Sequence, residues 1–303
     1  ISVGINMSTI TSLISSGGGS ASIVNETIDI NSDANLITLE DGRVYLKGGV
    51  TTTDTTTYPD ANVTLGYKGT SFYVRTQDAQ PRSLTWDGTY FWVLGGGGST
   101  ATVYKYNASG VYQNVSFAVG GQGNGAYGIT WDGTHLWVVE YTNDTVNKYT
   151  TAGVYTGTSF SVGSQDLVPH DITWDGTYFW VLGYGNKSVY KYNSSGVYQN
   201  VSFSVNAQDT QPYGLTWDGT HFWMLGNVTK KFYKYNASGA YQNVSVDASV
   251  GVEQIWGIEA VGGSFWITSA STDYVYKIEE SIGVTSSSGT EVQIGKQNYV
   301  RIK

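Results

Sequence analysis

The chain has 303 residues, enough to bury the core of one large domain or two smaller ones. Charged residues make up 13% of it and aromatic residues 14%, with 39 glycines, a formal net charge of −8 and no cysteine. The lack of cysteine excludes disulfides, thiolate nucleophiles and cysteine-ligated zinc, and the absence of a basic stripe argues against a nucleic-acid partner. No run of 18 apolar residues occurs, so we expect no membrane span.

The chain opens on a segment of alternating polarity and a linker, which together form an arm over residues 1–20. One face of the predicted strand carries four apolar side chains, Ile1, Val3, Ile5 and Met7. The Ser/Gly run at 15–20 is typical of a flexible linker. A tethered strand needs a sheet, because its backbone groups and its apolar face both require partners. Two partners are open: its own domain, or a neighbouring copy, which would join copies into a filament.

Residues 21–74 form a second β-rich segment. Its Asp41-Gly42 pair precedes the Asp-Gly turn of the repeats that follow by about one repeat length, and residues 71–74 match residues 202–205 in phase. The segment is therefore a candidate for an extra repeat, or for an addition to the repeats.

A repeated unit fills residues 75–280. The motif Thr-Trp-Asp-Gly-Thr recurs about every 43 residues, with its tryptophan at Trp86, Trp131, Trp174 and Trp217. A fifth, degenerate copy has Ala260 at the tryptophan position. Lysines recur in a constant phase at Lys105, Lys148, Lys191, Lys234 and Lys277. Five copies of one unit are visible.

Each unit predicts four short antiparallel strands. In the copy at 212–244, two strands flank the Asp218-Gly219 turn and two more flank the turn at 236–239. Four strands in about 43 residues is the size of a propeller blade. The sequence predicts an all-β fold, a β-propeller of five clear four-stranded repeats with a sixth blade as the alternative, preceded by the N-terminal strand arm.

The repeat resembles NHL and YVTN-type propellers in its order of strand, Asp-Gly turn, apolar strand and Tyr-Lys-Tyr-Asn strand. It is more similar to propeller repeats of phage virion and tail-fibre proteins, on residues 128–134 (Gly-Ile-Thr-Trp-Asp-Gly-Thr) and 154–160 (Val-Tyr-Thr-Gly-Thr-Ser-Phe). Segments 41–61 and 299–303 are similar to parts of phage fibre and virion proteins. The resemblance implies a propeller fold and a place on a virion or fibre, and it brings no fixed set of catalytic residues.

Asparagine glycosylation motifs are in excess, because they include 12 of the 18 asparagines where composition predicts about four. The candidate sites are Asn6, Asn25, Asn62, Asn107, Asn114, Asn143, Asn186, Asn193, Asn200, Asn227, Asn236 and Asn243. Repeat inheritance explains two phases of three sites each, and the remaining sites lie outside those phases. We expect N-glycosylation of an exported protein.

Nothing in the sequence nominates a catalytic centre, a metal site or a cofactor. The repeated aspartates of the Asp-Gly turns occupy equivalent environments, whereas a general acid and base need different ones. The three histidines are scattered, and there is no phosphate-binding loop.

The repeated aromatic and basic residues have two interpretations. Tryptophan pairs such as Trp174 with Trp180 are expected to fill the space between stacked blades, with a ring of sugar-binding platforms as the alternative. The in-phase lysines are expected at solvated positions of the third strand.

With residues 281–303 as a C-terminal β tail, these features lead to one interpretation. The protein is expected to be a non-enzymatic structural protein, extracellular or on a virion surface, that forms a filament or tail fibre with copies of itself. The alternative is a carbohydrate-binding adhesin propeller on a fibre or tail, with glycans as partners.

Overall fold

The computed structural model describes the backbone of residues 10–14, 22–26, 36–38, 44–46, 56–57, 63–96, 101–119, 125–248, 254–285, 291–294 and 301–302. Side chains are described for residues 70–96, 101–119, 125–248 and 254–279. The chain divides into two compact units, Ile1–Leu65 with Glu280–Lys303, and Gly66–Glu279. In the described ranges, no helix has the length and apolar character needed to cross a bilayer.

The first unit contains short strands in two small sheets. One sheet joins β1 (Ile10–Ile14), β2 (Ser22–Glu26) and β5 (Thr56–Thr57). The other joins β27 (Arg301–Ile302), β4 (Val44–Leu46) and β3 (Leu36–Thr38), so segments far apart in the sequence contribute to one sheet. The predicted assembly strand at residues 1–8 lies outside the described residues.

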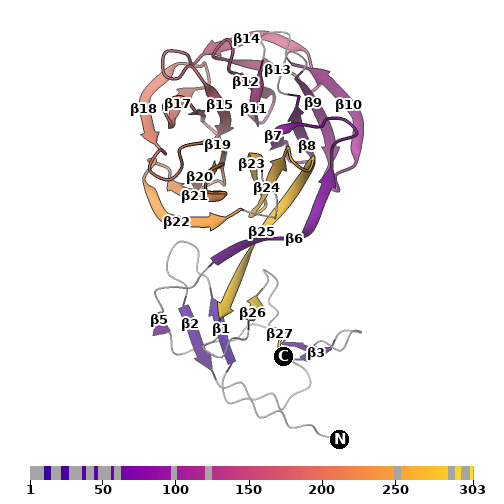
Figure 1. Ribbon diagram of the computed structural model, residues 1–303, viewed down its shortest axis with the longest axis vertical. Helices are drawn as coiled ribbons and strands as arrows, with labels where there is room; N and C mark the ends of the chain where they lie inside the picture. Colours follow the sequence, from indigo (N-terminus) through magenta and orange to yellow (C-terminus); the bar gives the residue numbers. More distant parts are fainter. Residues whose placement is uncertain are drawn as a thin grey trace, which may run out of the picture. The chain divides into compact units, whose positions relative to one another are not determined.

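The second unit is a β-propeller of five four-stranded antiparallel blades (Figure 1). Blade 1 comprises β7 (Pro81–Trp86), β8 (Tyr90–Gly95), β9 (Thr102–Asn107) and β10 (Tyr112–Ala118). Blade 2 comprises β11 (Ala126–Trp131), β12 (Leu136–Glu140), β13 (Thr145–Tyr149) and β14 (Tyr155–Ser161). Blade 3 comprises β15 (Pro169–Trp174), β16 (Tyr178–Gly183), β17 (Ser188–Asn193) and β18 (Tyr198–Ser204). Blade 4 comprises β19 (Pro212–Trp217), β20 (His221–Gly226), β21 (Lys231–Asn236) and β22 (Tyr241–Asp247).

Blade 5 closes the ring with a strand from before the first repeat. Its β23 (Ile255–Val261), β24 (Ser264–Ser269) and β25 (Tyr274–Thr285) are followed outward by β6 (Val63–Tyr73), which pairs with β25. The end of β25 also pairs with β26 (Glu291–Ile294).

The outer-strand phenylalanines show that β6 takes the place of a fourth strand. Phe160 of β14, in blade 2, packs tightly on Gly196 of blade 3. A Cβ at Gly196 would overlap the phenylalanine side chain. Phe72 of β6 meets Gly110 of blade 1 in the same way. The alternative of a sixth blade drawn from residues 21–74 is therefore wrong, because the end of that segment supplies the outer strand of blade 5.

Aromatic side chains interlock each blade with the next. Trp180 of blade 3 lies 4.6 Å from Phe222 of blade 4, and Trp266 of blade 5 lies 4.6 Å from Phe91 of blade 1, between ring centroids. In blade 2 an aliphatic residue, Leu136, takes the phenylalanine position and packs with Trp92. The expectation that tryptophans fill the space between blades is confirmed for this second tryptophan of each pair.

The Asp-Gly turns hold these tryptophans in place. Asp175 Oδ1 accepts the backbone N–H groups of Thr177 and Tyr178, at 2.8 and 2.7 Å, while Oδ2 accepts the indole N–H of Trp180 at 2.6 Å. The other three complete copies repeat the indole bond at 2.6–2.7 Å. The repeated aspartates thus have a structural role that the turn interpretation only partly anticipated.

Four of the five in-phase lysines cover aromatic faces, and the fifth, Lys277, forms an ion pair with Glu279. Lys191 Nζ lies 3.7 Å from the ring centroid of Tyr178 and 5.1 Å from that of Trp180. Lys105 repeats the first distance over Tyr90. These contacts are cation–π interactions, which stabilise partly exposed pairs by about 0.5–1 kcal/mol. These four lysines are therefore packed on aromatic rings rather than simply solvated.

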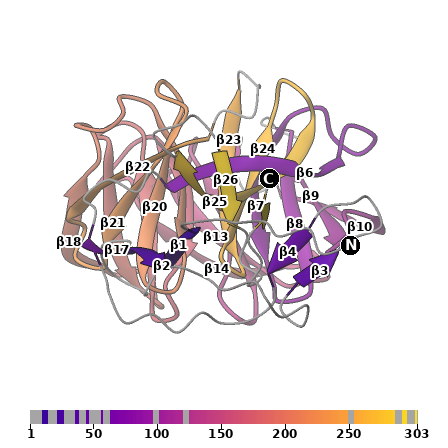
Figure 2. The ribbon, with the colours of Figure 1, turned by 90° about the horizontal axis from the view of Figure 1, so that it is seen from below.

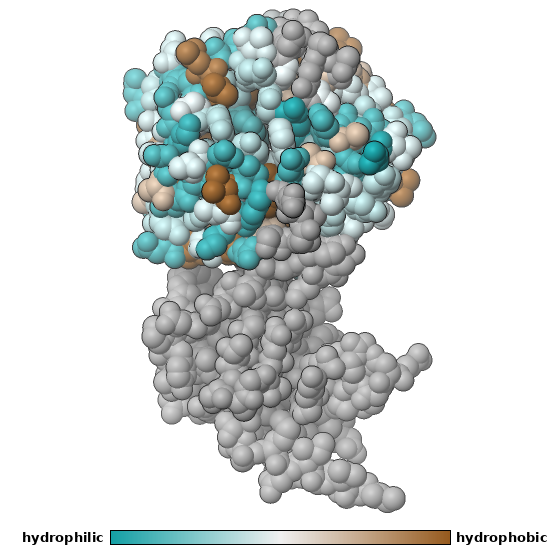
Figure 3. Space-filling view, in the orientation of Figure 1, coloured by the Kyte–Doolittle hydropathy of each residue, from teal (hydrophilic) through white to brown (hydrophobic). Residues whose placement is uncertain are grey.

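The surface is largely polar. Figure 3 shows a propeller face dominated by hydrophilic residues, with apolar side chains scattered singly. The most exposed large apolar residues include Leu167, at 70% exposure. Viewed as in Figure 2, strands such as β20 and β21 run across the thickness of the disc, so the ends of the inner strands open onto its two faces.

Candidate ligand pocket on the propeller axis

Each inner strand carries a β-bulge near its beginning. In β15 the register with β16 shifts between Pro169 and Asp171, which leaves His170 as the extra residue. The same shift occurs at Arg82, Tyr127 and Tyr213 in three other inner strands, and in β23 it spans Trp256 and Gly257. A bulge redirects the side chain of its extra residue. Five large side chains from five blades are thereby gathered at one end of the axis.

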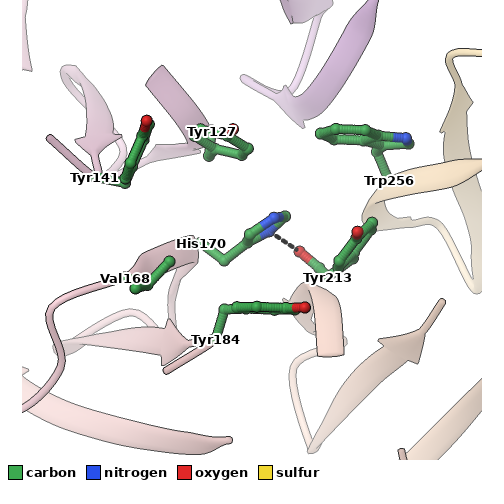
Figure 4. Close-up of a pocket in the computed structure, with 7 residues that line it drawn as sticks. All are labelled: Tyr127, Tyr141, Val168, His170, Tyr184, Tyr213 and Trp256. Atoms are coloured by element: carbon green, nitrogen blue, oxygen red, sulfur yellow. Dashed lines mark hydrogen bonds between the residues drawn. The ribbon is translucent and has the colours of Figure 1, made fainter. Parts of the chain in front are cut away.

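Four of these side chains and three neighbours line a cavity of about 280 Å³ (Figure 4). The lining residues are Tyr127, Tyr141, Val168, His170, Tyr184, Tyr213 and Trp256. Tyr141 and Tyr184 occupy equivalent positions, because each directly follows the second strand of its blade. The cavity is therefore aromatic on most sides and carries phenol hydroxyls and one imidazole.

His170 contributes the imidazole of the pocket wall, and the tautomer of this ring follows from its hydrogen bond. Its Nδ1 lies 2.9 Å from the carbonyl oxygen of Tyr213. A carbonyl can only accept, so Nδ1 carries the proton and Nε2 presents a lone pair. The ring also stacks on Tyr213 at 4.6 Å and 17°.

Burial keeps His170 neutral. It lowers the pKa of the imidazole to about 4, opposed by the hydrogen bond to Tyr213 and assisted by the positive charge of Arg82. The side chain is only 7% exposed. At neutral pH the pocket therefore contains an uncharged hydrogen-bond acceptor.

Arg82 places a cation against the same aromatic rings. Its guanidinium carbon lies 4.1 Å from the ring centroid of Tyr127 and 4.5 Å from that of Trp256. The arginine is 8% exposed and does not line the cavity itself. The faces of Tyr127 and Trp256 that contact Arg82 are therefore already covered by a cation.

Two carboxyl groups fill the axis beyond the pocket. Asp171 accepts from Ser83 Oγ at 3.2 Å and from the backbone N–H of Leu215 at 2.8 Å, so it joins blades 1, 3 and 4. Complete burial raises its pKa well above the ordinary range. Asp171, the residue after His170, therefore closes the pocket along the propeller axis.

Glu259 of blade 5 joins blades 1 and 4 in a similar way. Its Oε1 accepts from Thr85 Oγ1 and from the backbone N–H of Trp86, both at 3.0 Å, and its Oε2 accepts from Thr216 Oγ1 at 3.1 Å. Burial raises its pKa to about 7 against the lowering effect of these bonds. Within the described ranges, no group of three or more His, Asp or Glu residues is arranged to hold a metal ion.

The predicted glycosylation sites are spread over the blades, and three of them serve a turn. Asn193 Oδ1 accepts the backbone N–H groups of Ser195 and Val197, at 3.0 and 2.9 Å, and the same bonds occur at Asn107 and Asn236. The phase Asn114, Asn200 and Asn243 has left-handed backbone, with φ of 57°, 56° and 55°. Asparagine tolerates this conformation better than most residues. Both inherited phases therefore have a backbone reason for asparagine that is independent of glycans.

The other sites differ in how free their amides are. The amide nitrogens of Asn186 and Asn227, to which a glycan would be attached, donate to Gln165 and Gln211, at 2.7 and 2.9 Å. Asn143 is exposed. Asn6 and Asn62 lie outside the described residues, and only the backbone of Asn25, in β2, is described. N-glycosylation stays a prediction, as does assembly through Ile1, Val3, Ile5 and Met7.

Comparisons with known proteins support the fold alone. No protein-family model and no curated protein matches the sequence. Among solved structures, the glutaminyl cyclase of Myxococcus xanthus is 11% identical, over 72% of this chain and 97% of that one, with a TM-score of 0.57. A streptogramin B lyase is 14% identical, over 90% and 93%, with a TM-score of 0.45. The virginiamycin B lyase of Staphylococcus aureus is 16% identical, over 96% and 86%, with a TM-score of 0.41. The fold is that of a β-propeller, and the virion resemblance stays a prediction.

Sequence reasoning missed the pocket, although a signal for it was present. In the five repeats, the second position of the inner strand is occupied by Arg82, Tyr127, His170, Tyr213 and Trp256, whereas the end of the strand is an aliphatic residue followed by Thr-Trp in the first four copies. In the sequence His170 looks isolated because no other repeat has a histidine at its position. In a repeat protein, a position that varies among the repeats is not fixed by the packing that the repeats share, so it is a candidate for a functional role.

Proposed function

We propose that the protein is a non-enzymatic, extracellular recognition propeller that binds carbohydrate in the axial pocket. One observation carries the proposal: an aromatic cavity with an acceptor nitrogen and several phenol hydroxyls. Ligand sites are typically lined by apolar and aromatic side chains, with a few polar groups that fix the orientation of the ligand. Sugar rings suit such a wall, because their C–H faces stack on aromatic rings and their hydroxyls both donate and accept hydrogen bonds.

The pocket is a better candidate for sugar binding than the turn tyrosines. Lys191 covers one face of Tyr178, and Lys105 covers one face of Tyr90. In contrast, Tyr127, Tyr184 and Tyr213 present their hydroxyls without a hydrogen bond to any residue in the described part of the chain.

Replacing Trp256 with alanine should reduce glycan binding at least tenfold, because it removes the largest ring from the wall. Binding is measured first on a glycan array and then by tryptophan fluorescence titration with the sugars that score. Tyr178→Ala is the matched control, since it removes an aromatic ring from the same propeller outside the pocket. Loss of binding in Tyr178→Ala with retention in Trp256→Ala would move the site to the turns, and an empty array would reject the function.

A second candidate is a filament or fibre subunit, favoured by the alternating segment at residues 1–8 and its linker. We propose that this arm adds a strand to a neighbouring copy, in an exported and N-glycosylated protein. A recognition pocket and a filament role are compatible, because assembly would repeat the pocket along a fibre.

Deletion of residues 1–14 should leave a folded propeller that no longer associates, since the arm is separate from the repeats in sequence. Electron microscopy and light scattering of the full chain and the truncated chain check this. Filaments that persist after the deletion would contradict assembly through the arm.

A further inference from the structure

The size of the axial pocket limits how much sugar it holds. Its volume of about 280 Å³ lies just below the usual range for ligand pockets, about 300–1,000 Å³. Asp171, hydrogen-bonded across the axis to Ser83 and Leu215, blocks the way beyond His170. A chain of sugars has no exit along the axis, so the space suits one ring entering from the open face.

The charge around the pocket limits which ring it accepts. None of the lining residues carries a formal charge while His170 is neutral, as its lowered pKa of about 4 indicates. The Arg82 guanidinium lies 4.1 Å from the Tyr127 ring centroid, so the aromatic face that would favour a ligand cation already has one. An ammonium group on the ligand would meet the like charge of Arg82. A carboxylate would lose its hydration in an aromatic cavity where no lining residue can form an ion pair with it, because Arg82 does not line the cavity.

The polar groups of the wall require a donor from the ligand. Nδ1 of His170 is committed to the carbonyl of Tyr213, so Nε2 is available only as an acceptor. A sugar hydroxyl placed at Nε2 donates to it and can accept in turn from a tyrosine hydroxyl. Figure 4 shows His170 between Tyr127, Trp256 and Tyr213, with its ring directed into the space they enclose.

We infer that His170 is a specificity-determining residue that accepts a hydroxyl of a single uncharged sugar ring, so that the pocket selects the terminal unit of a glycan. This inference rests on the proposed function. The selection has two parts: shape excludes the interior of a chain, and the acceptor nitrogen excludes rings without a hydroxyl at that place.

Three substitutions separate the acceptor role from a structural role. His170→Phe keeps an aromatic ring and removes both nitrogens. His170→Asn can keep a donor to the Tyr213 carbonyl and lacks the outer nitrogen. His170→Gln can place an amide oxygen near the Nε2 position. The acceptor role predicts about tenfold weaker binding for the phenylalanine and asparagine variants, with the glutamine variant within about threefold of the wild type.

The probes are methyl glycosides of glucose, galactose, mannose and N-acetylglucosamine, with glucuronate and glucosamine as charged analogues and a glycan array for longer chains. We expect neutral single rings to bind, the charged analogues to bind at least tenfold more weakly, and a longer chain to lose binding when its terminal unit is replaced by a charged ring. Thermal unfolding of each variant checks that the propeller is folded.

The outcomes are distinguishable. If glycans bind but the asparagine variant binds like wild type, or the glutamine variant is no better than it, the role of His170 is rejected while the proposed function survives. Binding that is indifferent to the terminal unit rejects selection of chain ends. If no sugar binds the wild-type protein, the proposed function fails and the inference fails with it.

Discussion

Trp180→Ala is expected to destabilise the propeller by about 3–5 kcal/mol, the range for deleting a large buried aromatic side chain. Trp180 is 2% exposed and packs between two blades, 4.6 Å from Phe222 and 6.0 Å from Phe203 between ring centroids. Its indole N–H donates to Asp175 Oδ2 at 2.6 Å, so the substitution also leaves that oxygen without its partner. Urea unfolding followed by circular dichroism measures the loss.

Two controls separate the contributions at this site. Trp180→Phe keeps an aromatic ring against Phe222 but cannot donate to Asp175, and should lose about 1–2 kcal/mol. Leu167→Ala removes an apolar side chain that is 70% exposed, and should change stability by less than about 0.5 kcal/mol. A loss below about 1 kcal/mol for Trp180→Ala would show that this contact between blades is not a main source of stability.

Raising the pH from 4.5 to above 7 should destabilise the propeller through Glu140, by up to about 3 kcal/mol. Glu140 is fully buried, and neither carboxylate oxygen meets hydrogen-bond geometry with any described residue. Burial raises its pKa to about 7, against a lowering effect of the Asn147 amide. The unfolded chain ionises first as the pH rises, so the folded state loses its advantage across this window and no more is lost above it.

The repeat explains why this carboxylate is exceptional. In blade 3 the equivalent residue is Gly183, where a Cβ would overlap the carboxylate of Asp166. Asp166 accepts the backbone N–H groups of Val168 and Asn186, at 2.8 and 2.6 Å. In blade 2 the carboxylate belongs to Glu140, on the strand itself, and it lacks such backbone partners.

Glu140→Gln should remove this part of the pH dependence while keeping the side-chain volume. The quantity to measure is the difference in free energy of unfolding between wild type and variant at pH 5 and pH 8, by urea titration with tryptophan fluorescence. All 10 tryptophans lie between Trp86 and Trp266, so the signal reports the propeller. The opposite effect of His170, whose lowered pKa removes stability as the pH falls below 6.5 toward 4, cancels in the difference. A difference that does not change with pH would contradict the assignment to Glu140.

Most of the fold follows from local patterns. A motif repeated about every 43 residues predicts blades, because each unit has four strands and two turns and must bury its faces against its neighbours. Even the closing strand was visible in outline, since residues 71–74 match the outer strand of another repeat in phase. The match could not say whether they belonged to a sixth blade or completed the fifth, because that depends on pairing between β6 and β25, far apart in the chain.

The axial pocket depended on tertiary structure for two reasons. Alternation predicts that His170 and Asp171 face opposite sides of β15, and the one-residue register shift between Pro169 and Asp171 changes that rule. Closure of the ring then brings His170 next to residues of other blades, such as Tyr213 and Trp256. The sequence by itself determined the blade, its turns and their number of copies, since these rest on contacts within a repeat. Only the tertiary structure decided what meets on the axis, because a bulge and a closed ring are set by pairing and packing between distant segments.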